Sequence, residues 1–249
     1  MEFADIHIHA LYGVDDGPKA EKETIQMLDA IYADGVRYLC FTPHFHPGYF
    51  GDNYEKIGQT YHKIRSYANQ RYPDLQLFLG NELRYDKGSI SWLKEGHCRT
   101  MNHTRYVLVD FSERESEKAI IAGLEHLLNS GYVPILAHAE RYAKLDFRTK
   151  RIREFKENGV WIQLDIQSLY GDFGLAAARR AKAILSNHLA DFVATDAHDL
   201  VHRPPGLSRG YRYISQNYGE SYAAALFRGN ALQILYGNAN EEDGDGNSK

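Results

Sequence analysis

The chain has 249 residues, of which 43% are hydrophobic, and its formal net charge is −4. This length and apolar content suit one large α/β domain, which we expect over residues 1–237. The acidic balance gives no basic field that would attract nucleic acid, and the apolar runs have strand length, well short of the roughly 20 residues of a membrane span.

Seven apolar runs predict β-strands, at residues 3–7, 36–42, 75–80, 105–111, 132–137, 160–165 and 190–195. Helical patterns predict helices at residues 21–34, 54–72, 116–130, 147–158, 175–187, 207–218 and 220–235. This alternation predicts parallel strands joined by crossovers, and seven units indicate a (β/α)7 barrel with one unit fewer than the usual eight. An open doubly wound sheet is the alternative, which the lack of G-x-G-x-x-G after the first strand disfavours.

The two ends of the sequence and the cysteines bear on location. No basic or long apolar leader precedes the first predicted strand, and Cys40 and Cys98 give no disulfide framework. We therefore expect a reducing, cytoplasmic setting. Residues 238–249 hold acidic residues among Gly and Asn without an apolar anchor, which predicts a disordered acidic tail.

Histidines and carboxylates recur at or just after the ends of the predicted strands and in the first loop. They are His7, His9, Asp16, His44, Glu82, Asp110, His138, Asp196 and His198. The strand ends of a (β/α) barrel face one rim, so we expect these side chains to lie together there. Imidazole and carboxylate without thiolate suit Mn, Fe(II), Zn or Co. Nine ligands exceed the need of one ion, and two or three ions that share Glu82 fit the number better.

Other polar residues near this rim have predicted roles. Asp15 competes with Asp16 for the loop position, and Asp5 is expected to be a hydrogen-bond partner of the site. Arg141 follows His138 by three residues, and Arg203 lies in the loop after the seventh strand. Guanidinium groups beside a metal cluster bind phosphate oxygens, so both arginines are predicted to contact a phosphate.

This combination predicts a metal-dependent phosphomonoester hydrolase. We expect a metal-bridging hydroxide to attack phosphorus in line, without a phosphoenzyme, while the ions and arginines stabilise the equatorial oxygens. His46 or Asp199 could protonate the leaving group. Cysteine-based phosphatase chemistry is disfavoured because it needs an arginine six residues after the cysteine, where this sequence has His46 and Thr104.

Short motifs carry a resemblance to a known family. They are residues 5–9 (DIHIH), 14–19 (VDDGPK), 42–44 (TPH), 80–82 (GNE), 137–142 (AHAERY), 195–198 (TDAH) and 203–205 (RPP). With these motifs the chain resembles the PHP (polymerase and histidinol phosphatase) superfamily. More narrowly, it resembles the CpsB/YwqE-type bacterial manganese-dependent protein-tyrosine phosphatases. The resemblance extends from the first strand to about residue 237.

The resemblance implies a distorted seven-stranded TIM-like barrel and three divalent ions, most often Mn²⁺, with Fe²⁺, Zn²⁺ or Co²⁺ as alternatives. It implies removal of phosphate from the tyrosine-rich tail of a bacterial tyrosine kinase that controls capsule or exopolysaccharide synthesis. By the family pattern, the first ion would be held by His7, His9, Glu82 and Asp196. The second would be held by Glu82, Asp110 and His138, and the third by Asp16, His44 and His198. Arg141 and Arg203 would hold the phosphate. The family usually has Glu at position 110, so Asp110 is shorter by one methylene.

Three other functions stay open from the sequence. They are a small-molecule phosphatase similar to histidinol phosphatase, a PHP nuclease, and a binding module without catalysis. A protein substrate would need an open cleft. Tyr49 and Phe50 in the loop 45–52, and aromatic residues in the loop 170–173, could stack on a phosphotyrosine ring or could pack within their own loops.

Overall fold

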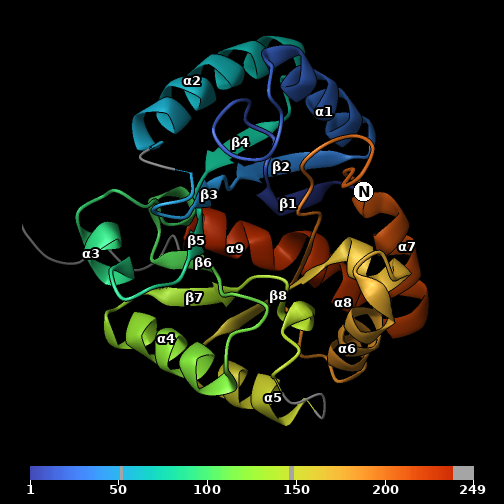
Figure 1. Ribbon diagram of the computed structural model, residues 1–249. Helices are drawn as coiled ribbons and strands as arrows, with labels where there is room; N and C mark the ends of the chain where they lie inside the picture. The colour runs from blue at the N-terminus through green and yellow to red at the C-terminus, as the bar shows by residue number, and fades with distance from the viewer. Residues whose placement is uncertain (51–52, 146–148, 238–249) are drawn as a thin grey trace, which may run out of the picture.

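Parallel strands form the centre of the molecule, and helices surround them (Figure 1). The structure is a computed structural model that describes residues 1–50, 53–145 and 149–237. The predicted tail at 238–249 and the first two residues of the predicted helix 147–158 lie outside the described residues.

The strands form two hydrogen-bonded sheets in which every pairing is parallel. The first sheet has the order β1 (Phe3–Ile8), β2 (Val36–Phe41) and β4 (Gln76–Leu79). The second has the order β3 (His44–Phe45), β5 (Glu82–Arg84), β6 (Tyr106–Asp110), β7 (Val133–Leu136), β8 (Trp161–Asp165) and β9 (Phe192–Ala194).

Two predicted strands continue beyond an interruption, and the prediction missed their second parts, β3 and β5. Between β4 and β5, Gly80 N donates to Phe41 O at 2.8 Å and Glu82 N donates to Pro43 O at 3.2 Å. A side chain at position 80 would bring a Cβ to 2.9 Å from the Met101 sulfur, so a residue other than glycine would have to displace the Met101 side chain. The chain therefore keeps its direction through both interruptions.

The strands of the two sheets follow one curl, and β1 meets the segment that follows β9. Ile8 forms a bridge with Ala197, and His9 N donates to Ala197 O at 2.9 Å. Asp196 N donates to His7 O at 2.8 Å. The two edges of an open doubly wound sheet would not make these contacts. The structure therefore shows the predicted α/β fold with parallel strands, in the form of a curled sheet.

Side chains alternate between two cores along each strand. On β6, Val107 and Val109 belong to the larger core between strands and helices, whereas Tyr106 and Leu108 belong to a separate cluster inside the curl. Helix α9 (Asn230–Tyr236) passes behind the strands in Figure 1 and supplies Ala231, Ile234 and Leu235 to the inner cluster. Helix α9 therefore packs at the end where the strands begin. The polar residues lie at the opposite end, where the strands finish.

The helices that surround the sheet are α1 (Glu21–Ala33), α2 (Tyr54–Arg71), α3 (Ser89–Lys94), α4 (Glu117–Asn129), α5 (Lys150–Glu157), α6 (Gly174–Ser186), α7 (Leu207–Tyr218) and α8 (Glu220–Ala224). Helix α4 begins where Ser116 Oγ accepts a hydrogen bond from Ala119 N at 3.2 Å. The sequence pattern missed the short α3. It also read residues 220–235 as one helix, which a π-helical segment, Ala225–Gly229, divides into α8 and α9.

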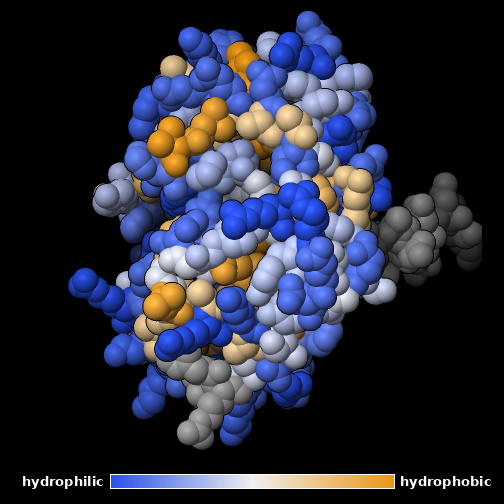
Figure 2. Space-filling model, turned by 90° about the vertical axis from the view of Figure 1, so that its right-hand side faces the viewer, coloured by the Kyte–Doolittle hydropathy of each residue, from blue (hydrophilic) through white to orange (hydrophobic). Residues whose placement is uncertain are grey.

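The face of the molecule that Figure 2 shows is mainly hydrophilic. Figure 2 shows the side of the molecule that lies to the right in Figure 1, where hydrophobic residues are scattered in small groups among hydrophilic ones. Among the described residues, no helix combines the length and apolarity needed to cross a membrane.

Candidate metal centre

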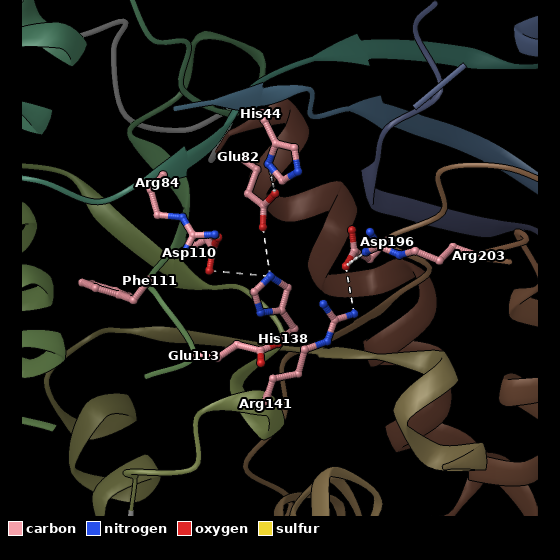
Figure 3. Close-up of a pocket in the computed structure, with 10 residues that line it drawn as sticks. All are labelled: His44, Glu82, Arg84, Asp110, Phe111, Glu113, His138, Arg141, Asp196 and Arg203. Carbon is pink, nitrogen blue, oxygen red and sulfur yellow. Dashed lines mark hydrogen bonds and ion pairs between the residues drawn. The ribbon is translucent and has the colours of Figure 1, made fainter. Parts of the chain in front are cut away.

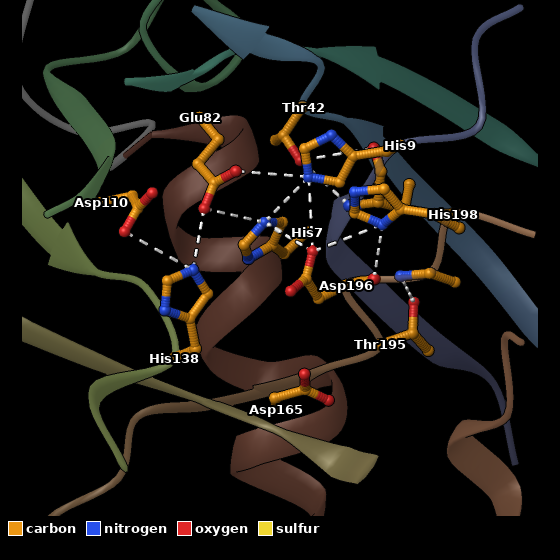
Figure 4. Close-up of polar contacts among 12 residues, drawn as sticks. His7, His9, Thr42, Glu82, Asp110, His138, Asp165, Thr195, Asp196 and His198 are labelled. Atoms are coloured by element: carbon orange, nitrogen blue, oxygen red, sulfur yellow. Dashed lines mark hydrogen bonds and ion pairs between the residues drawn. The ribbon is translucent and has the colours of Figure 1, made fainter. Parts of the chain in front are cut away.

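The strand ends and the first loop bring the nine predicted ligands together. Figure 4 shows His7, His9, Glu82, Asp110, His138, Asp196 and His198. Eight of the nine ligands form three overlapping groups in which the possible ligand atoms lie within 4.8 Å of one another: His9, Asp16, His44 and His198; His7, His9 and Glu82; and Glu82, Asp110 and His138. The ninth, Asp196, adjoins the second group. Its Oδ1 lies 3.3 Å from His7 Nε2 and 3.4 Å from His9 Nε2.

Glu82 occupies the middle of this arrangement and is almost fully buried. Its Oε1 lies 2.9 Å from His138 Nε2 and 3.4 Å from His7 Nε2. Its Oε2 lies 2.7 Å from His44 Nδ1 and 3.4 Å from His9 Nε2. One carboxylate thus faces four imidazoles, which is the geometry expected of a ligand shared between ions.

The neighbours of His9 separate the roles of two adjacent aspartates. Asp15 Oδ2 lies 2.8 Å from His9 Nδ1 and accepts a hydrogen bond from His44 N at 3.1 Å. This contact leaves His9 Nε2 directed at the cluster. Asp16 Oδ1 lies 3.3 Å from His198 Nε2 and 3.4 Å from His44 Nε2. The geometry therefore favours Asp16 as the ligand and Asp15 as the group that orients His9.

Gln163 on β8 orients a second imidazole. Its Oε1 accepts a hydrogen bond from His138 N at 2.8 Å and lies 3.1 Å from His7 Nδ1. An amide oxygen only accepts, so His7 Nδ1 carries the proton and Nε2 keeps its lone pair for the cluster. Asp5 accepts a hydrogen bond from Thr195 Oγ1 at 2.6 Å, which ties β1 to the chain just before Asp196.

Two of the predicted ligands have a left-handed backbone shortly after a strand. His138 follows β7 by two residues and has φ of 34°, and Asp196 follows β9 by two residues and has φ of 49°. Apart from glycine, the residues that adopt this conformation most readily are asparagine, aspartate and histidine. Here the turn directs each side chain back over the strand ends.

A pocket of about 180 Å³ opens beside the cluster (Figure 3). Its lining residues are His44, Glu82, Arg84, Asp110, Phe111, Glu113, His138, Arg141, Asp196 and Arg203. Arg141 forms an ion pair with Asp165 and another with Asp196 at 2.9 Å. Arg203 also pairs with Asp196. The pocket has room for a phosphate group, with both predicted phosphate-binding arginines in its wall.

The two predicted proton donors are not part of the pocket wall. Neither His46 nor Asp199 is among the residues that line the pocket. Asp199 Oδ1 accepts hydrogen bonds from Val201 N at 2.6 Å and His202 N at 2.5 Å. The pKa of Asp199 is lowered because these backbone hydrogen bonds outweigh its partial burial. These contacts favour a role in holding the loop before Arg203.

Sequence reasoning missed two charged residues of the site, although its own rules could have found them. Arg84 lies two residues after Glu82 on β5, on the same side of the strand, as His9 lies two residues after His7. Its Nη2 is 2.7 Å from Asp110 Oδ2. Asp165 ends β8 just as Asp110 ends β6, yet it contacts Arg141 rather than a histidine.

The charges of the site suit divalent cations. His7 Nε2 and His9 Nε2 face each other at 3.2 Å, an arrangement that repels unless a proton or a cation lies between them. Burial of His7 disfavours its protonated form and lowers its pKa. The negative charges of Asp196 and Glu82 together have the larger, opposite effect, so the pKa of His7 is raised. At His9, contacts with Asp15, Asp196 and Glu82 together outweigh burial, and the pKa of His9 is raised well above its usual value. Burial, with Glu82 nearby, raises the pKa of Asp110 to about 8.

These raised pKa values predict that metal binding depends steeply on pH. His7, His9 and Asp110 keep protons to higher pH than usual in the ion-free protein, and an ion must displace them. We expect the affinity for Mn²⁺ to fall by at least about a hundredfold from pH 8 to pH 6. Titration calorimetry in buffers of different ionisation enthalpy would measure the protons released. Binding without proton release would contradict this expectation.

Comparison with known proteins relates this site to characterised ones. A family model described as capsular polysaccharide synthesis, CpsB/CapC, matches residues 3–236. The tyrosine-protein phosphatase CpsB of Streptococcus agalactiae serotype III (strain NEM316) is 34% identical over 236 residues, which cover 93% of this chain and 97% of the relative.

Solved structures share the fold. One chain comes from the crystal structures of YwqE from Bacillus subtilis and CpsB from Streptococcus pneumoniae, described as unique metal-dependent tyrosine phosphatases. It matches with a TM-score of 0.84 at 24% identity, covering 94% of each chain. Histidinol phosphate phosphatase from Lactococcus lactis, complexed with zinc, L-histidinol and phosphate, matches with a TM-score of 0.57 at 13% identity, covering 88% of this chain and 94% of that one.

Proposed function

Because this chain belongs to the CpsB/CapC capsular polysaccharide synthesis family, we propose that it is a metal-dependent protein-tyrosine phosphatase. The observation that carries the proposal is the pair Arg141 and Arg203, which meet at Asp196 on the edge of nine clustered ligands. The relatives named tyrosine-protein phosphatases point to a phosphotyrosine protein as the substrate. The partner would be the tyrosine-rich tail of a bacterial tyrosine kinase, and a cytoplasmic location stays a prediction.

The proposed centre would hold three divalent metal ions, and Mn²⁺ is the ion that we propose for it. One ion would be held by His7, His9, Glu82 and Asp196. A second would be held by Glu82, Asp110 and His138. A third would be held by Asp16, His44 and His198. If β2 and β3 are counted as one interrupted strand, and β4 and β5 as another, the described residues form seven strands. We propose that these strands form a seven-stranded barrel with the metal centre at its rim. Bound divalent ions offset the charge of a phosphate monoester and lower the pKa of a coordinated water.

The residues of the chain bind and orient the substrate. The guanidinium groups of Arg141 and Arg203 hold the equatorial phosphate oxygens, where charge develops during the transfer. Asp165 pairs with Arg141 from the side of β8 and limits its rotation. A phenolate leaves readily, so a strong general acid is not required.

Phosphate release tests this function. Metal-stripped protein would be assayed with a phosphotyrosine peptide, with and without Mn²⁺, and with histidinol phosphate as a competing substrate. Mn²⁺-dependent release that favours the peptide would support the proposal. Preference for histidinol phosphate would move the protein to the small-molecule phosphatases, whose fold is also similar. Release from neither substrate would reopen the nuclease and binding-module alternatives.

The structure separates the two aromatic residues of the β3–α2 loop. Phe50 stacks on the His44 ring, with centroids 5.1 Å apart and planes 7° apart, so it packs against a ligand. Tyr49 is 76% exposed and stacks on His46. An exposed ring near the rim can stack on a phosphotyrosine ring.

We therefore expect Tyr49→Ala to raise KM for a phosphotyrosine peptide by roughly threefold to tenfold, with little change in kcat. Initial-rate kinetics would measure both constants. Tyr236→Ala is the matched control, because Tyr236 is also exposed but lies on α9, at the opposite end of the strands. An unchanged KM in Tyr49→Ala would show that this ring does not bind the substrate.

A further inference from the structure

The carboxylate of Asp110 has both oxygens engaged by groups that are not candidate ligands. Oδ2 lies 2.7 Å from Arg84 Nη2. Oδ1 accepts a hydrogen bond from the Tyr142 hydroxyl at 3.1 Å. His138 Nε2, its neighbour in the ligand group, is 3.8 Å away from Oδ1. An ion shared by Asp110 and His138 would have to bind an oxygen that already accepts a hydrogen bond, and it would lie close to the positive charge of Arg84.

The other buried carboxylates of the cluster differ in this respect. Glu82 directs both oxygens at imidazoles. Asp196 gives Oδ2 to Arg141 and Arg203 but keeps Oδ1 within 3.4 Å of His7 and His9. Each of them therefore already presents an oxygen to the imidazoles, whereas Asp110 is turned toward Arg84 and Tyr142.

The guanidinium of Arg84 is held near Asp110 by the sheet. β5 pairs with β6 so that Arg84 lies opposite Asp110 in the register. The Arg84 side chain is 31% exposed and lines the pocket (Figure 3). A fixed positive charge at this place repels a divalent cation and stabilises the carboxylate without one.

We infer that Arg84 competes with the ion of the Glu82, Asp110 and His138 group, so that this ion is held more weakly than the other ions of the centre. The inference rests on the proposed metal centre and deepens it. The fully loaded enzyme would then form only at a higher concentration of free metal than the partly loaded one. Arg84 would set that concentration.

Equilibrium dialysis with Mn²⁺, followed by metal analysis, tests the inference without any substrate. The wild type should show tight binding followed by a distinct weaker step. Arg84→Met removes the charge and should tighten the weaker step by about tenfold or more. Arg84→Lys keeps a charge and should retain the weak step. Arg37→Met is the matched control, because Arg37 pairs with Asp74 on the surface, and its binding should equal the wild type.

His138→Ala assigns the weaker step to this group, because His138 belongs to no other ligand group among the described residues. The step should disappear in this variant. Three outcomes would overturn the inference. The wild type could bind all its ions with the same affinity, the weak step could be unchanged in Arg84→Met, or the weak step could persist in His138→Ala. If Arg84→Met does not fold, as judged by circular dichroism, Arg84→Gln takes its place. Binding as inferred without phosphatase activity would refute the proposed function alone.

Discussion

Glu82→Gln should reduce kcat/KM for a phosphotyrosine peptide by roughly a thousandfold or more, the largest effect that we expect from one substitution. Glu82 faces His7, His9, His44 and His138, and it belongs to two of the three ligand groups. An amide of the same shape has one oxygen and no charge, so neither group keeps its shared anionic ligand. Metal analysis of the purified variant should show fewer bound ions per protein.

Glu157→Gln is the control for this substitution. Glu157 is exposed at the end of α5, does not line the pocket, and belongs to none of the ligand groups. Its kinetics should stay within about twofold of the wild type, as expected for an exposed position away from the chemistry. If Glu82→Gln kept both its ions and a tenth of the activity, Glu82 would not be the shared ligand.

Arg141→Met should lower kcat/KM by about a hundredfold to a thousandfold while the protein keeps its ions. The guanidinium lies in the pocket wall, 3.7 Å from the centroid of the Phe173 ring, and pairs with Asp165 and Asp196. Arg141→Lys should recover little activity, because an ammonium group cannot form the paired, planar contacts of a guanidinium. Steady-state kinetics and metal analysis would be measured together.

Arg179→Met provides the comparison for a lost arginine, because Arg179 is exposed on α6. It should behave as the wild type. If Arg141→Met lost its ions along with its activity, the arginine would act by holding Asp196 in place. Retained ions with lost turnover would instead indicate contact with the phosphate.

The order and type of the main elements could be predicted from the sequence because strand and helix patterns alternate strongly. The interruptions could not. One apolar run ends at Thr42 and Pro43, and another ends at Gly80 and Asn81. Nothing in the sequence pattern showed that strand hydrogen bonding resumes at His44 and at Glu82. The π-helical segment Ala225–Gly229 has the same periodic apolar residues as its neighbours and reads as one helix with them.

The site could be predicted as a set of residues but not as a network. Strand-end positions indicated which histidines and carboxylates would gather. The pairing of Arg84 with Asp110 depends on the register between β5 and β6, which a single sequence does not give. Similarly, Gln163 has no charge to draw notice, and only the fold shows that it binds both His7 and His138.

The contact between the first strand and the segment after β9 bears on how the protein is made. Asp5 and Thr195 bond across 190 residues of sequence, and His7 needs Asp196 beside it. Contacts this distant in sequence close large loops and form slowly. On the ribosome, the N-terminal histidines emerge long before their C-terminal partners. The growing chain therefore exposes an incomplete set of the proposed metal ligands, and the whole centre can assemble only after the segment with Asp196 and His198 has emerged.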